Sequence, residues 1–258
     1  MNADKVTVTV SRAKPARAAT LTAVMVTVTL TLLLATGAAT AAECVVLLHG
    51  LARTSMSLDK MEEALQDEGY STANIDYPSR EHEIAELASM AVEEGLATCR
   101  AGEDVEKIHF VTHSLGGILV RQYLSTGAID ELGRVVMLGP PNQGSIAADD
   151  MDGVPGFDWI NGPAGRQLGK GEGSVPLALG AVDFELGVIA GNRSIDPITS
   201  AVLEDPNDGR VSIADTKIEG MDDFVIVEHS HAFMMRMQEP IELTKRFLRT
   251  GRFTASSE

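Results

Sequence analysis

The sequence predicts an α/β fold, in which a mainly parallel sheet of about six strands has helices on both of its faces. Short, continuous apolar runs recur along the 258 residues, as in strands that are buried on both faces. These runs alternate with longer segments in which apolar residues recur every three or four positions, as in amphipathic helices. Strands joined by crossover helices run parallel. No linker interrupts the alternation, so we expect one domain over 43–258.

Each element in the first part of the chain has a local justification. The first strand is the apolar run 44–48, which stops at a His-Gly pair. A helix with apolar spacing of three and four residues follows over 56–68 and stops at a glycine. The strand 71–77 stops at a proline, and a second helix with the same spacing covers 81–99.

The alternation continues to the end of the chain. The strand 107–113 leads directly into a helix over 115–125, and the strand 133–138 stops at a Pro-Pro pair. The segment 142–182 is rich in Gly and Asp and has no clear period, so we expect loops, short helices and a lid-like insertion there. The last predicted elements are two strands, 184–190 and 224–228, and a closing helix, 232–250.

Residues 1–42 have the parts of a targeting segment. A polar, basic start is followed by the uncharged run 18–35 and then by small residues, and Ala39 and Ala41 suit a signal-peptide cleavage site. The alternative is an uncleaved membrane anchor, because the apolar run approaches the roughly 20 residues that cross a bilayer. In both cases we expect the domain outside the cytoplasm, either periplasmic or secreted, or anchored to the membrane.

Two cysteines in an exported chain predict a disulfide between Cys44 and Cys99. Closing so long a loop without strain would stabilise the fold by about 4 kcal/mol. The alternative is two buried free thiols.

Charge excludes some classes of partner. The chain has 21 Lys and Arg against 37 Asp and Glu, a formal net charge of −16. A surface this acidic repels nucleic acids and anionic lipid headgroups, so we expect no nucleic-acid partner, and membrane contact only through an uncleaved amino-terminal segment. No cluster has metal-ligand spacing, and no cofactor is predicted.

Ser114 is the candidate nucleophile. It lies between the strand 107–113 and the helix 115–125, with a glycine two residues later, as in the strained turn called a nucleophile elbow. The usual first glycine of that motif is Thr112 here, and a serine at this place can also be a simple helix cap. We expect the adjacent His113 to orient its neighbours or to line the pocket.

Two backbone amides are candidates for an oxyanion hole. A His-Gly pair that ends an early strand lets the next backbone turn inward, so the Leu51 N–H can be one donor. The Leu115 N–H, at the start of the helix after the serine, can be the other. Losing one such donor costs about 3 kcal/mol of transition-state stabilisation in comparable enzymes.

A serine hydroxyl needs a base, and the base needs an acid that orients it. Asp208 lies in an Asn-Asp-Gly segment and His231 directly precedes an apolar helix start, which gives the order Ser, Asp, His along the chain. Asn-Asp-Gly is also an ordinary turn. Asp196 and Asp183 are therefore kept as reserve acids. His229, two residues before His231, is kept as the reserve base.

Four segments resemble the α/β-hydrolase superfamily, in particular serine hydrolases of the lipase/esterase type. They are residues 45–51 (VVLLHGL), 112–117 (THSLGG), 138–145 (LGPPNQGS) and 207–211 (NDGRV). The resemblance implies Leu51 as an oxyanion donor, Ser114 as nucleophile, Asp208 as acid and His231 as base. It implies hydrolysis of a small-molecule or lipid ester through an acyl-enzyme. Two alternatives remain, a non-catalytic exported binding protein and an acyltransferase that uses the same triad.

Overall fold

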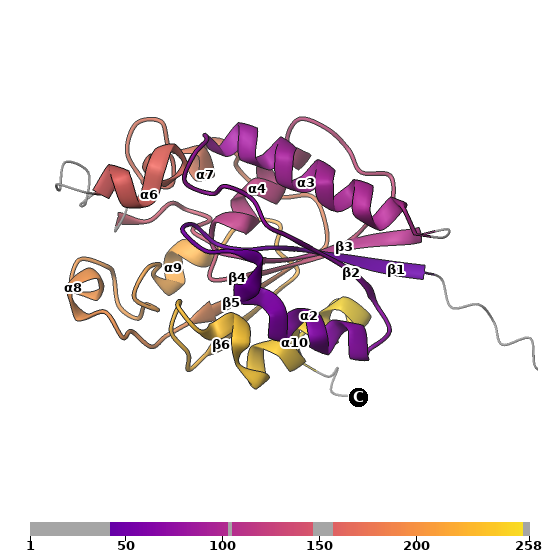
Figure 1. Ribbon diagram of the computed structural model, residues 1–258. Coiled ribbons are helices and arrows are strands. Elements are labelled where there is room, and N and C mark those ends of the chain that lie inside the picture. Colours follow the sequence, from indigo (N-terminus) through magenta and orange to yellow (C-terminus); the bar gives the residue numbers. More distant parts are fainter. Residues whose placement is uncertain (1–41, 103–104, 147–156, 255–258) are drawn as a thin grey trace, which may run out of the picture. The chain divides into compact units, whose positions relative to one another are not determined.

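The computed structural model describes residues 42–102, 105–146 and 157–254. The predicted α/β fold class is confirmed, and the six strands that are described are all parallel, in the order β2-β1-β3-β4-β5-β6 (Figure 1). The predicted signal or anchor over 1–42 lies, except for its last residue, outside the described residues. The strands are β1 Ala42–Leu48, β2 Ser71–Ile75, β3 Val105–His113, β4 Leu132–Leu138, β5 Leu186–Gly191 and β6 Asp223–Val227.

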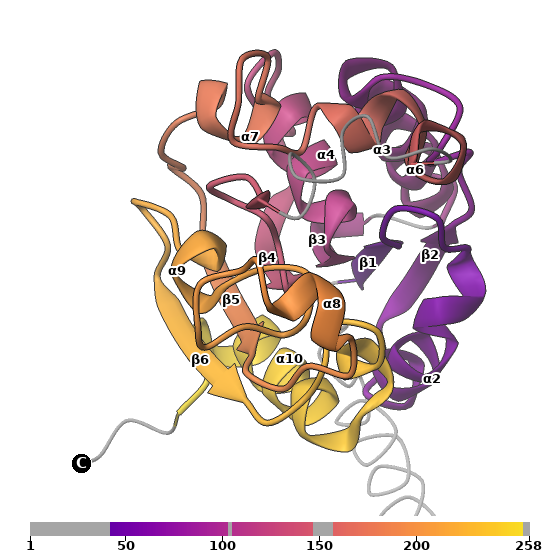
Figure 2. The same cartoon turned by 90° about the vertical axis from the view of Figure 1, so that its left-hand side faces the viewer.

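The alternation of side chains along the strands builds two cores. In β1, Val46 and Leu48 face one core and Val45 and Leu47 face the other, because successive side chains of a strand point to opposite faces. The first core is covered by α3 and α4, and the second by α2 and α10 (Figures 1 and 2). These helices are α2 Asp59–Asp67, α3 Ile84–Arg100, α4 Leu115–Leu124 and α10 Gln238–Thr250.

Three predicted helices begin later than expected, and one of them is α3, which begins at Ile84 instead of 81. The segment predicted as a helix over 56–68 starts as the 3-10 turn η1 Ser55–Leu58 before α2. The prediction that the closing helix starts at 232 is wrong for its first residues. A 3-10 turn, η2 Met234–Arg236, precedes α10. Pro240 lies in the first turn of α10, where its missing N–H is harmless, but a helix continuing from 232 would clash with its ring.

The segment 142–182 contains short helices, as expected, although 147–156 lie outside the described residues. Its helices are α6 Phe157–Arg166, which is kinked at Gly162, and α7 Val175–Ala178. The buried guanidinium of Arg121 on α4 donates to carbonyl oxygens near both ends of the segment, Asn142 O at 3.1 Å and Gly180 O at 2.8 Å. Burial lowers the pKa of Arg121 to about 10. Gating by a lid here stays a prediction.

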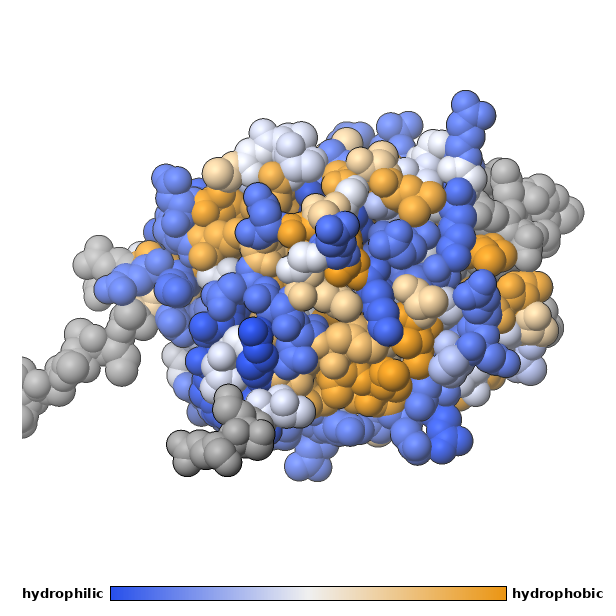
Figure 3. Space-filling view, turned by 180° about the vertical axis from the view of Figure 1, so that it is seen from behind, coloured by the Kyte–Doolittle hydropathy of each residue, from blue (hydrophilic) through white to orange (hydrophobic). Residues whose placement is uncertain are grey.

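Two further short helices, α8 Pro197–Ser200 and α9 Ile213–Thr216, lie between β5 and β6. Strand β6 is an edge of the sheet, and its Ile226 side chain is 45% exposed. Figure 3 faces this edge and shows a patch of hydrophobic surface bordered by hydrophilic side chains.

The predicted disulfide forms between Cys44 at the start of β1 and Cys99 near the end of α3. The two residues are 55 positions apart, and a loop of that length corresponds to about 4 kcal/mol in the chain-entropy model. Within the described ranges, no helix is both long and apolar enough to cross a membrane.

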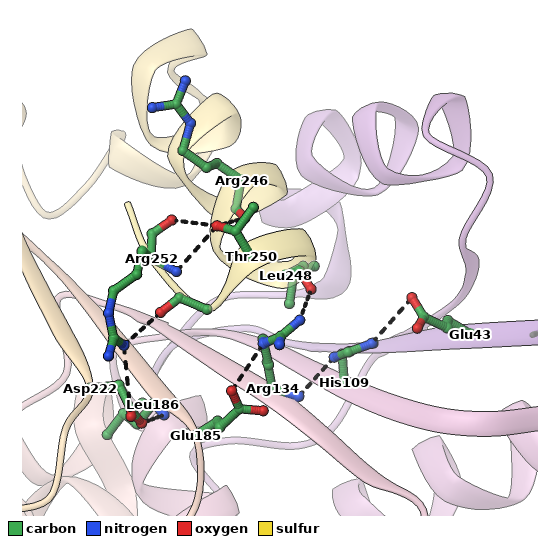
Figure 4. A network of polar contacts seen from close by, with 11 residues as sticks. Glu43, His109, Arg134, Glu185, Leu186, Asp222, Arg246, Leu248, Thr250 and Arg252 are labelled. Atoms are coloured by element: carbon green, nitrogen blue, oxygen red, sulfur yellow. Dashed lines mark hydrogen bonds and ion pairs between the residues drawn. The ribbon is translucent and has the colours of Figure 1, made fainter. Parts of the chain in front are cut away.

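A polar network ties α10 to the amino-terminal ends of the strands (Figure 4). The backbone N–H of Arg134 donates to Nδ1 of the buried His109 at 2.8 Å, and the Arg134 guanidinium donates to Leu248 O at 2.8 Å. Glu43 and Glu185 flank the pair, at 3.5 Å from His109 Nε2 and 3.3 Å from Arg134 Nε. His109 is therefore a structural residue at the end of the sheet opposite to Ser114.

Candidate active site

Ser114 occupies a strained turn between β3 and α4. Its backbone has φ 54° and ψ −119°, and among the described non-glycine residues only Ala52 shares a positive φ. Such a conformation costs of order 1–3 kcal/mol and persists only where the surroundings impose it. A Cβ on Gly116 would collide with the carbonyl oxygen of Leu48, so the glycine two residues after the serine lets α4 pass over β1.

Thr112 replaces the usual first glycine of the elbow without leaving a polar atom unpaired. Its side chain is fully buried, and its hydroxyl donates to Val136 O at 3.4 Å on β4. A Cβ on Gly117 would lie 3.3 Å from the Thr112 hydroxyl, so the second glycine of the Gly-Gly pair makes room for the threonine.

Asp208 and His231 form a buried pair. Asp208 Oδ2 lies 2.8 Å from His231 Nδ1, and the backbone N–H of His231 donates to Asp208 O at 3.0 Å. The other carboxylate oxygen, Oδ1, accepts from the backbone N–H groups of Arg210 at 2.9 Å and Val211 at 2.8 Å. Because a carboxylate can only accept hydrogen bonds, the ring proton of His231 lies on Nδ1, which leaves Nε2 with a lone pair.

The serine and the Asp-His pair lie at the same end of the sheet. The Ser114 N–H donates to Leu138 O at 2.9 Å, and a Cβ on the next residue, Gly139, would lie 3.0 Å from His231 Nδ1 and 3.1 Å from Asp208 Oδ2. Figure 2 looks onto this end, which α6, α7, α8 and α9 surround. Within the described residues no hydrogen bond joins the Ser114 hydroxyl to His231. Such contacts often tighten only when substrate binds.

The two candidate oxyanion donors have no internal acceptor. Among the described residues, neither the Leu51 N–H nor the Leu115 N–H donates a hydrogen bond. The turn before Leu51 is held in shape, because Gly50 O lies 2.8 Å from His49 Nδ1 and accepts from the Arg53 N–H at 3.2 Å. Gly50 also lies beside the candidate nucleophile, since a Cβ on it would be 3.2 Å from Ser114 Cβ.

The family follows from the sequence pattern over most of the chain. A model of the alpha/beta hydrolase family matches residues 45–240. The chain belongs to the alpha/beta hydrolase family. A comparison with curated proteins finds no significant match.

Solved structures share the alpha/beta hydrolase fold at low sequence identity. The mature lipase BlEst2 from Bacillus licheniformis is 19% identical with a TM-score of 0.65, over 84% of this chain and 94% of its own. The metagenomic carboxyl esterase MGS0156 is 23% identical with a TM-score of 0.60, over 76% of this chain and 66% of its own. The phospholipase PlaB from Legionella pneumophila is 19% identical with a TM-score of 0.61, over 75% of this chain and 54% of its own.

In this alpha/beta hydrolase two of the reserve residues, His229 and Asp196, have other partners. His229 lies 3.3 Å from Glu239 Oε2. Asp196 caps α8, where Thr199 N and Thr199 Oγ1 donate to it at 3.1 and 2.7 Å, and Arg210 lies 3.4 Å away. Asp183 is exposed. Within the described residues no group of three or more His, Cys, Asp or Glu could hold a metal ion.

His113 holds the backbone of His231. Its Nε2 lies 3.0 Å from His231 O and donates to that carbonyl, and the two rings pack with their centres 4.7 Å apart. Burial lowers the pKa of His113 well below its ordinary value, and the nearby His231 lowers it further, so His113 stays neutral. The expectation that His113 orients its neighbours agrees with this contact.

Sequence reasoning missed the residues that support the turn of the candidate oxyanion donor Leu51. The Tyr77 hydroxyl donates to His49 O, and the rings of His49 and Tyr77 stack with their centres 4.0 Å apart. The Ala52 N–H donates to Ser79 Oγ at 3.1 Å. The signal that could have found these residues is their place around Pro78, at the end of the strand adjacent to β1.

Three buried histidines predict that the fold loses stability in acid. Burial is the first cause that lowers the pKa of His49, His109 and His113 below the ordinary value of 6.5. Below about pH 6.5 the unfolded chain therefore binds more protons than the folded protein, and the free energy of unfolding falls as the pH falls. Each histidine contributes up to about 1.4 kcal/mol per pH unit.

This pH dependence can be measured by denaturant unfolding between about pH 8 and pH 5. His109→Asn keeps an acceptor near the Arg134 N–H and removes one titrating ring, so the variant should show a shallower slope. His82→Gln serves as a surface control. If His109→Asn leaves the slope of the free energy of unfolding against pH unchanged, the buried His109 does not contribute to the loss of stability in acid.

Proposed function

We propose that this alpha/beta hydrolase is a serine hydrolase that cleaves carboxylic esters through an acyl-enzyme. The observation that carries the proposal is the buried Asp208–His231 pair, joined at 2.8 Å, beside a serine held at φ 54° on the turn before a helix. A serine at such a turn, a base and an orienting acid in this chain order are the parts of a Ser-His-Asp triad.

The proposed reaction has two steps. His231 Nε2 takes the proton of Ser114 as the serine oxygen attacks the ester carbonyl, and the N–H groups of Leu51 and Leu115 stabilise the oxyanion. His231 then gives its proton to the leaving alkoxide, and an acyl-serine remains. Water, deprotonated by His231, releases the carboxylic acid and restores the hydroxyl of Ser114. Asp208 stabilises the positive form of His231 throughout.

We further propose that the domain 43–258 is exported, with 1–42 as signal peptide or anchor. The Cys44–Cys99 disulfide supports this, because such bonds persist in oxidising compartments and are rare in the cytosol.

Covalent labelling tests the proposed function. A fluorophosphonate should label the protein at Ser114, as located by peptide mass spectrometry, because only an activated serine reacts with this reagent at an appreciable rate. Ser125→Ala, which removes an exposed hydroxyl at the end of α4, is the matched control and should label fully.

An unlabelled but folded protein would favour the alternative of a binding protein. If labelling succeeds, product analysis with added alcohols separates a hydrolase, which forms the free acid, from an acyltransferase, which forms a new ester.

A further inference from the structure

Three arginines lie next to the proposed catalytic groups in the sequence. Arg53 follows the oxyanion residue Leu51 by two positions, Arg210 follows Asp208 by two, and Arg236 lies shortly after His231. All three side chains are exposed. Because the structure brings Asp208, His231 and the turn of Leu51 to one end of the sheet, the three arginines also gather there.

Contacts between the segments confine Arg53 and Arg236 to one region. Arg53 donates to Ala232 O at 3.3 Å, directly after His231, and Arg236 donates to Met56 O at 3.2 Å, shortly after Arg53. The positive charges of Arg210 and Arg236 lower the pKa of Arg53, after partial burial as the first cause, and the charge of Arg53 in turn lowers that of His113. Arg210 and Arg236 therefore each lie within electrostatic reach of Arg53.

The three arginines differ in whether a carboxylate lies beside them. Arg210 lies 3.4 Å from the carboxylate of Asp196, whereas Arg53 and Arg236 have no carboxylate within ion-pair distance among the described residues. Two further carboxylates near this end lie beside histidines, Asp76 at 3.6 Å from His49 and Glu239 at 3.3 Å from His229. In a chain of net charge −16, two exposed guanidinium groups without a carboxylate partner within the described residues would attract a negatively charged ligand.

Arginine suits an oxyanion in particular. Its planar guanidinium has five N–H groups and matches the oxygens of phosphate or carboxylate with two parallel hydrogen bonds. Arg53 and Arg236 each use one nitrogen on a backbone carbonyl. Exposed apolar side chains lie nearby in the sequence, with Met56 66% and Phe233 52% exposed. Charge and apolar surface together fit an ester that carries both an acyl chain and an anionic group.

We propose that Arg53, Arg210 and Arg236 form a subsite for a phosphate group carried by the ester substrate, an inference that rests on the proposed function. The phosphate would belong to the alcohol part of the ester and would hold the substrate while Ser114 attacks its carbonyl. A phosphate dianion matches a cluster of three guanidinium groups and one carboxylate.

A pair of matched substrates tests the subsite. Dibutyryl glycerol phosphate and dibutyryl glycerol, both below their micelle concentrations, differ only in the anionic group. The ratio of their kcat/KM values should favour the phosphate and should fall with added salt. In R53Q/R210Q/R236Q the ratio should fall by about tenfold or more, while glutamine can still donate to the carbonyls of Ala232 and Met56. R252Q removes one exposed arginine at the opposite end of the sheet and should keep the ratio.

A ratio that the triple variant leaves unchanged, with both esters affected equally, overturns the subsite and indicates that the arginines only join the two turns. A binding measurement separates this failure from failure of the proposed function. In S114A, inorganic phosphate should raise the melting temperature, and the three glutamines should abolish the rise, whether or not the protein hydrolyses esters. Comparing short-chain phosphatidate with phosphatidic acid in phosphatidylcholine vesicles then distinguishes a soluble phosphate ester from a lipid headgroup.

Discussion

Replacing Ser114 with alanine should lower kcat for a p-nitrophenyl ester by about 10⁶-fold. The alanine removes the oxygen that forms the acyl-enzyme, and no other described hydroxyl is placed on a turn at φ 54° between a strand and a helix at this end of the sheet. The oxyanion amides and the binding site remain, so a small residual rate above that of water is expected. Initial rates with purified wild type and variant at saturating substrate give the measurement.

Ser125→Ala is the matched control, because it removes a hydroxyl from the end of the same helix, where Ser125 Oγ donates to Gln122 O. Its rate should equal that of wild type. Thermal unfolding should confirm that both variants are folded. Equal rates for Ser114→Ala and wild type would refute the proposed nucleophile.

Replacing Asp208 with asparagine should lower kcat by about 10⁴-fold. Oδ1 of residue 208 accepts two backbone N–H groups, and an asparagine oxygen can continue to accept them. The amide NH₂ would then face His231 Nδ1 and donate to it. The histidine proton would move to Nε2, so that the ring could no longer take the proton of Ser114. The loss should appear in kcat more than in KM, because the substitution keeps the shape of the side chain and changes only its hydrogen bond to His231.

Asp196→Asn provides the control for the acid. Asp196 caps α8 through Thr199, so its replacement should lower stability by about 1 kcal/mol or less and leave kcat near that of wild type. If Asp196→Asn lowered kcat as strongly as Asp208→Asn, the assignment of the acid would have to be reversed. Denaturant unfolding of both variants separates lost stability from lost chemistry.

Local sequence patterns were enough to predict the sheet. The apolar runs of β1 and β4 are fully buried along most of their lengths, because a parallel sheet covered by helices has no solvent face. The predicted boundaries failed where a special residue changed the local backbone, as Pro240 does at the start of the last helix. Because that change depends on the clash of a proline ring with the preceding turn, apolar spacing alone does not show it.

The candidate site divides in the same way. Ser114 could be proposed from its neighbours, because the strand, turn, helix and glycines that impose its conformation are contiguous in the chain. The neighbouring residues could not decide between Asp208 and Asp196 as the acid, since both lie in polar turns with similar sequence signals. The choice depends on which carboxylate is buried against a histidine. That contact joins two separate segments of the chain and is visible only in the structure.

The sequence by itself determined the α/β class and the family, and it singled out Ser114 as the candidate nucleophile. Each of these depends on the period of apolar residues or on residues close together in the chain. Only the tertiary structure decided that Asp208 pairs with His231, that His113 holds the His231 backbone, and that Arg53, Arg210 and Arg236 gather at one end of an acidic protein. Some of these contacts join residues more than a hundred positions apart. In the others, the neighbouring sequence does not show which carboxylate pairs with which histidine. The energy of the two histidine contacts comes from burial and hydrogen bonding, which exist once the strands have been placed side by side.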